Sequence, residues 1–195
     1  MRKFGDRTYR LARRYRAVST SIVFLLGGFV ATWALACQQE DHREEATMSD
    51  EQKLEQIETM YQKYQRKFPQ VPSISVAELQ ELEKGDTPIV IVDVREPKEY
   101  SVSMIPGAIT AKEFESRKSE LEGSTVVTYC TAGYRSGLAA QKLMSEGWEV
   151  RNLAGSILAW THAGLPLVKD GKETHEVHVY SRGWDLSAEG YEPVW

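Results

Sequence analysis

Short apolar runs alternate with amphipathic stretches from about residue 74 onward. Residues 89–94 and 126–129 are rich in valine and isoleucine and show no polar alternation until Asp93, which is typical of strands buried on both faces. Residues 150–153 form a third short run, and helical patterns lie between and after these runs. The alternation predicts an α/β domain whose central, mainly parallel sheet is flanked by helices.

Ahead of this region, residues 49–69 carry the pattern of an amphipathic helix. Ser49 with Gln52 forms a capping-box signature, and Pro69 is expected to end the helix. We expect the apolar stripe to pack against the following domain, and a short dimer seam is the alternative. The stripe recurs at alternating spacings of three and four residues: Leu54, Ile57, Tyr61, Tyr64 and Phe68.

The compact domain is expected to occupy residues 70–169. Ser75 and Glu78 repeat the capping-box signature ahead of a short acidic helix, and Gly85 stands where a glycine commonly ends such a helix. In open parallel sheets the functional site lies at the carboxyl ends of the strands. Asp93 and Cys130 both stand at such ends, so we expect them at one edge of the sheet.

The first 37 residues combine a basic start with an apolar segment. Residues 2–16 hold seven of the 24 basic residues, whereas residues 19–36 are uncharged and mostly apolar, a pattern typical of a secretory signal. The small residues before Cys37 resemble a bacterial lipoprotein signal, and the run approaches the roughly 20 residues that span a bilayer. We expect residues 1–37 to be a signal peptide or membrane anchor, with lipidation at Cys37, a retained anchor and plain cleavage as alternatives.

The body of the chain is acidic. Residues 38–48 read as a polar linker, and beyond Cys37 the chain holds 17 basic and 27 acidic residues. Such a body is poorly suited to nucleic acid, so any anionic substrate must be held by local donors. We expect an exported protein, membrane-anchored or periplasmic, although Met48 as a second start would give a cytoplasmic form.

The chemistry of the chain centres on a single thiol. An apolar run delivers Cys130 to a short loop that contains Gly133 and ends at Arg135, and Ser136 is expected to open a helix over residues 137–146. A helix N-terminus and a nearby cation favour the thiolate, which is the nucleophilic form of cysteine. The arrangement predicts nucleophilic chemistry at Cys130.

Several sequence blocks around this loop resemble a single-domain rhodanese. They fall in the order of that family: DVREPKEY (93–100), SMIPGAI (103–109), YCTAGYRSG (129–137), NLAGSILAW (152–160) and GLPL (164–167). The resemblance implies a three-layer fold and a sulfurtransferase without a cofactor. It also implies that Cys130 takes a sulfane sulfur from a small anionic donor such as thiosulfate and passes it, as a persulfide, to cyanide, a small thiol or a protein thiol.

The same resemblance assigns roles to residues around the sulfur. Asp93 and Arg95 are expected to brace the site, Tyr134 to stand at its rim, and Arg135 to bind the anionic part of the donor. A structural salt bridge from Arg135 to Asp93 or Glu96 is the alternative, and both roles are compatible. The backbone N–H groups expected to cradle the sulfur belong to Thr131, Ala132, Gly133, Tyr134, Arg135 and Ser136.

Two positions depart from the family pattern, because Met104 stands where many members have histidine and Ser156 where a second glycine is common. The loop from Cys130 to Arg135 has four intervening residues, one fewer than in related phosphatases, and this spacing favours sulfur over phosphate. A binding, sensing or sulfur-carrier module without turnover is the alternative function, followed by a cysteine-dependent phosphatase or arsenate reductase.

The remaining candidates point to structural roles. His162, His175 and His178 lack cysteine partners, so we expect surface or packing positions and no metal site. A disulfide between Cys37 and Cys130 is not expected, because Cys37 lies at the signal boundary. The C-terminal tail, residues 170–195, is rich in tyrosine and tryptophan, and we expect it to pack on the domain or on the 49–69 helix.

The expected processing can be tested on the protein purified from its own cells. Mass spectrometry should find a lipid-modified N-terminus at Cys37, because small residues precede that cysteine. An intact Met1 would indicate a retained anchor instead, and a chain starting at Met48 would contradict export.

Overall fold

The computed structural model describes residues 48–195. The predicted signal or anchor, the lipidation at Cys37 and most of the predicted linker lie outside the described residues. Within them, none of the helices combines the length and the apolar character that crossing a bilayer requires.

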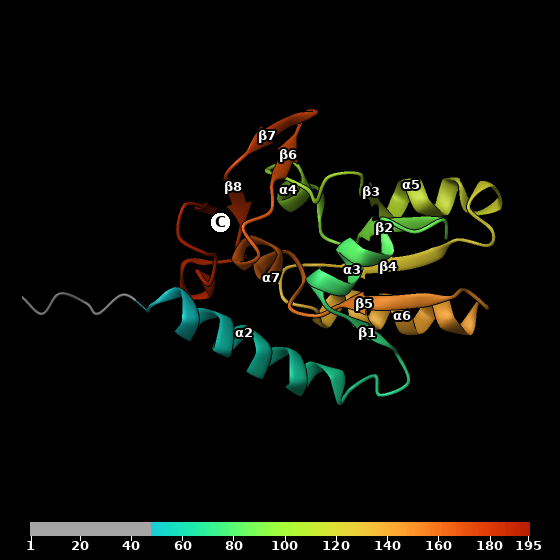
Figure 1. Ribbon diagram of the computed structural model, residues 1–195, viewed down its shortest axis with the longest axis horizontal. Coiled ribbons are helices and arrows are strands. Elements are labelled where there is room, and N and C mark those ends of the chain that lie inside the picture. Colours follow the sequence, from blue (N-terminus) through green and yellow to red (C-terminus); the bar gives the residue numbers. More distant parts are fainter. Residues whose placement is uncertain (1–47) are drawn as a thin grey trace, which may run out of the picture. The chain divides into compact units, whose positions relative to one another are not determined.

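A five-stranded sheet in which all neighbouring strands are parallel forms the centre of the domain (Figure 1). Its strands are β1 (Ser73–Ile74), β2 (Ile89–Asp93), β3 (Ile109–Thr110), β4 (Thr125–Tyr129) and β5 (Val150–Leu153). Their order across the sheet is β1-β5-β4-β2-β3. The three inner strands are the three predicted apolar runs, and the two edge strands are two-residue pieces too short to carry a periodic signal.

Helices cover both faces of this sheet. They are α2 (Asp50–Gln65), α3 (Val76–Leu82), α4 (Pro97–Tyr100), α5 (Ala111–Ser116), α6 (Tyr134–Ser145) and α7 (Ser156–His162), with 3₁₀ turns at Lys118–Glu120 and Arg182–Trp184. The predicted α/β class with a central parallel sheet flanked by helices is therefore confirmed.

Two hydrophobic clusters fill the spaces on either side of the sheet. Ile91 on β2 contributes to the cluster that includes residues of α3 and α7, whereas its neighbours Val90 and Val92 contribute to the cluster that includes residues of α5 and α6. Alternate residues of a strand point to opposite faces, so this division makes a three-layer domain. Each fully buried aliphatic side chain of this kind contributes about 1.5–3 kcal/mol to folding.

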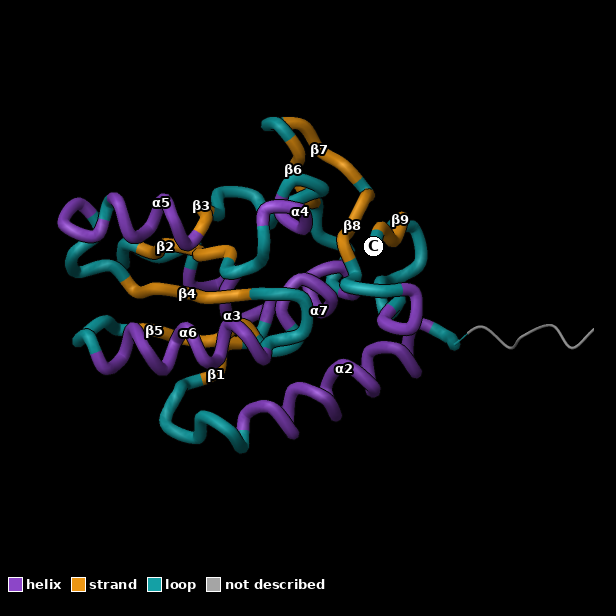
Figure 2. Tube along the Cα trace, turned by 180° about the vertical axis from the view of Figure 1, so that it is seen from behind, coloured by secondary structure: helices purple, strands orange, loops and turns teal. Residues whose placement is uncertain are grey.

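Helix α2 runs along the edge of the domain that carries β1 and β5 (Figures 1 and 2). The predicted capping box of Ser49 and Gln52 is confirmed, and the helix contacts α6 and α7. Its predicted end at Pro69 is wrong, because the helix stops at Gln65. The turn that follows brings Phe68, which is fully buried, against α6.

Helix α3 begins at the predicted capping box of Ser75 and Glu78. The prediction that Gly85 ends this helix is wrong, because α3 stops at Leu82 and its C-cap is Glu83 in the right-handed conformation. Gly85 instead donates its N–H to the Leu82 carbonyl in a following turn. A glycine in the left-handed conformation is not needed there.

Beyond α7 the chain forms two small strand pairs, with β6 (Leu167–Lys169) against β7 (Lys172–Thr174) and β8 (Glu176–His178) against β9 (Glu192–Val194). The C-terminal tail is anchored in the core, because Val177, Val179 and Leu186 are buried in the same cluster as α3 and α7.

The tail also bonds to the start of α2. Lys53 Nζ donates to the Ser187 carbonyl at 2.8 Å, and the Glu189 N–H donates to the Asp50 carboxylate at 2.9 Å. Helix α2 and the C-terminal tail therefore lie together at one end of the domain, as both views show (Figures 1 and 2).

The contact between Phe68 and Gly137 on α6 can be tested by adding one methyl group. A Cβ at Gly137 would stand 2.0 Å from Phe68 Cζ, and this ring is fully enclosed. We expect Gly137→Ala to lower the free energy of unfolding by about 1–2 kcal/mol in chemical denaturation, because overpacking outweighs the better helix propensity of alanine. Gly183→Ala is the control, since open space surrounds Gly183. Equal stability of both variants would contradict this packing.

Candidate active site

Cys130 lies directly after β4, at the carboxyl edge of the sheet, next to the end of β2 where Asp93 stands. The thiol is free, and the residue is buried with 2% of its surface exposed. The site is therefore at the edge that strand order predicts for an open parallel sheet.

The loop after Cys130 curls back toward the sulfur. Gly133 adopts the left-handed conformation with φ of 103°, and its N–H donates to Cys130 Sγ at 3.2 Å. Ser136 Oγ donates to the same sulfur at 3.5 Å. A side chain at Gly133 would be strained by this φ, which is why glycine serves at this turn.

The predicted helix start after this loop is wrong by three residues. Helix α6 begins at Tyr134 and not at Gly137, because the left-handed turn at Gly133 caps the helix immediately. Tyr134, Arg135 and Ser136 therefore belong to the first helical turn. Their side chains are held by the helix itself, which fixes them more firmly around the sulfur than a loop would.

Residues outside the loop hold Gly133 in place. Asn152 Nδ2 donates to the Gly133 carbonyl at 2.9 Å, and Tyr61 OH lies 2.7 Å from Ser73 Oγ. The Tyr61 ring packs so closely that a Cβ on Gly133 would stand 2.5 Å from it. Helix α2 and β5 thus brace the loop from behind.

Ser156, which departs from the family pattern, occupies a strained position beneath the thiol. It has a φ of 54°, which is uncommon for a residue with a side chain. Its Oγ accepts the Cys130 N–H at 3.1 Å and lies 3.2 Å from the Leu153 carbonyl, to which it donates. The hydroxyl thus fixes the backbone of the nucleophile.

Arg135 is paired with Glu99, a residue that the sequence did not reveal. Nη1 and Nη2 of Arg135 donate to the two carboxylate oxygens at 2.6 and 2.7 Å, and Nη2 also donates to Thr131 Oγ1 at 3.1 Å. The alternative partners considered from sequence, Asp93 and Glu96, are wrong. The overlooked sequence signal was the position of Glu99 as the third residue of α4. From there its carboxylate also accepts the Glu96 N–H at the start of the helix.

This pair sets the ionisation of both groups. Burial disfavours the charged form of Glu99, but hydrogen bonds from Arg135 and from the Glu96 N–H outweigh it and lower the pKa of Glu99 to about 2. The hydrogen bonds to Glu99 raise the pKa of Arg135, and the proximity of Cys130 raises it further. Arg135 is therefore a fixed cation beside the sulfur.

Asp93 and Arg95 form a second, fully buried ion pair behind the loop. Arg95 Nη2 donates to Asp93 at 2.7 Å and to the Ser103 carbonyl at 2.6 Å, while Tyr129 OH donates to Asp93 at 2.6 Å. Burial, followed by the charge of Asp93, raises the pKa of Tyr129 well above its usual value. These groups join the ends of β2 and β4 to the loop that contains Ser103, and none of their hydrogen bonds involves the thiol.

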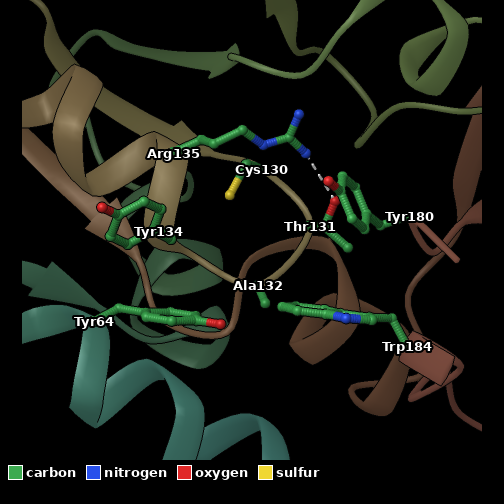
Figure 3. Close-up of a pocket in the computed structure, with 8 residues that line it drawn as sticks. All are labelled: Tyr64, Cys130, Thr131, Ala132, Tyr134, Arg135, Tyr180 and Trp184. Atoms are coloured by element: carbon green, nitrogen blue, oxygen red, sulfur yellow. Dashed lines mark hydrogen bonds between the residues drawn. The ribbon is translucent and has the colours of Figure 1, made fainter.

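Aromatic side chains surround the opening above Cys130. A cavity of about 300 Å³ is lined by Cys130, Thr131, Ala132 and Arg135, and by an aromatic wall made of Tyr64, Tyr134, Tyr180 and Trp184 (Figure 3). The predicted rim position of Tyr134 agrees with its exposure of 42%. Tyr64, Tyr180 and Trp184 were not predicted as site residues, since their positions depend on how α2 and the tail dock.

The three histidines within residues 48–195 occupy packing or surface positions. His178 Nδ1 accepts the Tyr180 N–H at 3.1 Å, and burial lowers the pKa of His178, so its ring is neutral. His162 bonds to the Leu186 carbonyl, and His175 packs against the Tyr191 ring. Among the described residues, no cluster of His, Cys, Asp or Glu side chains suits a metal ion.

The fold and the Cys130 loop define a member of the rhodanese family. Residues 75–163 match the family model described as Rhodanese-like domain, and a sulfurtransferase of Allochromatium vinosum is 40% identical over 84 residues, which cover 41% of this chain and 78% of that protein. The chain therefore belongs to the rhodanese-like family, as the sequence blocks indicated.

Other relatives show how far the similarity extends. An uncharacterised protein of Synechocystis sp. is 42% identical over 101 residues, which cover 50% of this chain and 56% of that protein. The crystal structure of a thiosulfate sulfurtransferase from Pseudomonas aeruginosa matches with a TM-score of 0.49 and 28% identity, over 60% of this chain and 23% of that one. The chain thus spans little more than half of the Synechocystis relative, and α2 and the tail lie outside the family match.

The Glu99–Arg135 pair gives a pH-dependent contribution to stability. Because the pKa of Glu99 falls from 4.5 to about 2 on folding, the contribution is fully present above about pH 4.5 and is lost as the pH falls through 2. We expect Glu99→Gln to be less stable than the wild type by about 1–3 kcal/mol at pH 7, and this difference should shrink toward pH 2 in denaturant titrations.

Glu96→Gln is the matched control, since the Glu96 carboxylate is largely exposed and 3.6 Å from Lys98. Its stability should stay within about 0.5 kcal/mol of the wild type at pH 7. A Glu99→Gln difference that does not change with pH would contradict the ion pair as the source of the effect.

Proposed function

We propose that this rhodanese-family chain is a sulfurtransferase in which Cys130 carries the sulfur as a persulfide, with thiosulfate as one donor. The observation that supports this most directly is the position of the sulfur. Cys130 Sγ accepts two hydrogen bonds from its own loop, lies at a cavity and has the Arg135 guanidinium beside it.

The first half of the reaction loads the cysteine. The Cys130 thiolate attacks the outer sulfur of thiosulfate, the sulfur–sulfur bond of the donor breaks, and sulfite leaves with the bonding electron pair. Arg135 is placed to attract the anionic donor, and its bond to Glu99 keeps its planar fork oriented.

The second half of the reaction removes the sulfur from Cys130. A thiophilic acceptor, either cyanide or a thiolate, attacks the outer sulfur of the persulfide, and the Cys130 thiolate leaves with the electron pair. Donors such as the Gly133 N–H and Ser136 Oγ suit both the thiolate and the persulfide anion, because each keeps negative charge near the loop.

For the place of this reaction we propose an exported or membrane-anchored protein. The proposal is based on the basic and apolar pattern of residues 1–37 alone. Because the rest of the chain is acidic, it does not attract an anionic donor. The loop and Arg135 must provide that attraction.

Treatment with thiosulfate tests the proposal on the full chain. We expect mass spectrometry to find one added sulfur atom on Cys130, and cyanide to release it as thiocyanate. Cys130→Ser should abolish both signals, because a hydroxyl cannot hold a sulfane sulfur, whereas Cys37→Ser should retain them. Equal thiocyanate from the wild type and Cys130→Ser would contradict the proposal, and a stable added sulfur without release would indicate a carrier.

A further inference from the structure

The aromatic wall consists of two ring pairs on opposite sides of the cavity. Tyr64 and Tyr134 form one pair, with ring centroids 5.3 Å apart, and Tyr180 and Trp184 form the other, 5.9 Å apart. Cys130 projects its sulfur into the space between the two pairs (Figure 3). A molecule that enters this cavity between the ring pairs therefore meets aromatic side chains on two sides of the sulfur.

Three of these four rings come from outside the part of the chain that matches the family. Tyr64 belongs to α2, and Tyr180 and Trp184 belong to the C-terminal tail, whereas the match covers residues 75–163. Most of the wall thus lies outside the domain that matches the family.

The tail side of the wall is fixed to the core. Val179, next to Tyr180, is fully buried, and Trp184 packs against the hydrophobic cluster that includes α3 and α7. Tyr180 has a φ of 71°, rare for a bulky residue, and its N–H is held by His178 Nδ1. Tyr180 and Trp184 are therefore held at the cavity by buried neighbours.

The cavity is larger than the smallest sulfur donors and acceptors require. Its volume of about 300 Å³ equals that of about ten water molecules, and an apolar cavity of about half this volume accommodates a benzene ring. Cyanide or thiosulfate would leave most of it to water. A ring-sized organic group would fill it and displace that water from the aromatic faces.

The charge of the lining restricts what this group can be. Among the described residues, Arg135 is the one cationic side chain in the lining of this cavity, and each of its terminal nitrogens already donates one hydrogen to Glu99. A thiol with several charged groups would find a single cation there and would lose hydration at its remaining charges. An uncharged, apolar body fits the lining.

From the wall, the volume and the single charge, we infer that the acceptor of the Cys130 sulfur is a small organic thiol with an uncharged, ring-sized apolar body. The inference depends on the sulfurtransferase function proposed above. The acceptor thiolate attacks the outer sulfur of the persulfide, the bond to Cys130 breaks, and the organic persulfide leaves while Cys130 returns to the thiolate. Trp184 and Tyr64 are the residues that select the acceptor.

The rate of sulfite release from thiosulfate can be measured with any acceptor, so it allows different acceptors to be compared directly. The acceptors to compare are benzyl mercaptan, 2-mercaptoethanol and cyanide. Wild-type kcat/KM should favour benzyl mercaptan over 2-mercaptoethanol by about tenfold or more. Trp184→Ala and Tyr64→Ala should each lower the ratio of kcat/KM for benzyl mercaptan to that for cyanide by about tenfold. The ratio also controls for misfolding, since loss of the Cys130 loop would lower both rates.

Trp195→Ala is the matched control, because Trp195 lies in the same tail, is 54% exposed and stacks with Arg182 away from the cavity lining. It should leave the ratio unchanged. Equal use of the two thiols by the wild type, or an unchanged ratio in both wall variants, would overturn this inference alone. Failure to release sulfite with any acceptor, cyanide included, would overturn the sulfurtransferase proposal and this inference with it.

Discussion

The left-handed turn at Gly133 is the constraint on which the rest of the site depends. It allows the Gly133 N–H to reach the Cys130 sulfur, and it starts α6 at the next residue, which places Arg135 and Ser136 in the first helical turn. The turn has no room for a side chain because the Tyr61 ring fills that space. One backbone conformation thus links the nucleophile, its donors and its cation.

Two arginine–carboxylate pairs stabilise this arrangement in different ways. The pair of Asp93 and Arg95 is fully buried and joins the ends of β2 and β4, so it stabilises the backbone beneath the site. Arg135, paired with Glu99, is one-third exposed and lines the same cavity as Cys130, so it combines a fixed position with access to a ligand. Because Glu99 is ionised at neutral pH, it keeps Arg135 oriented.

Sequence reasoning found the parts of the fold that local pattern determines. The inner strands, the capping boxes at Ser49 and Ser75, and the cysteine after β4 all carry short-range signals. It missed Glu99, whose importance comes from a contact with a residue 36 positions away. It also missed the part of the wall that α2 and the tail provide, since docking between distant segments leaves no periodic trace in the sequence.

Helix α2 serves two structures at once, because Tyr61 braces Gly133 while Tyr64 lines the cavity one helical turn further on. The tail lines the cavity with Tyr180 and Trp184, whereas the contacts that hold the Gly133 turn come from Tyr61 and Asn152. Changes in the tail can therefore alter selectivity while the nucleophile is preserved, whereas changes in α2 affect both. The tail is therefore the freer of the two segments to vary in sequence, whereas α2 is constrained by both of its contacts at once.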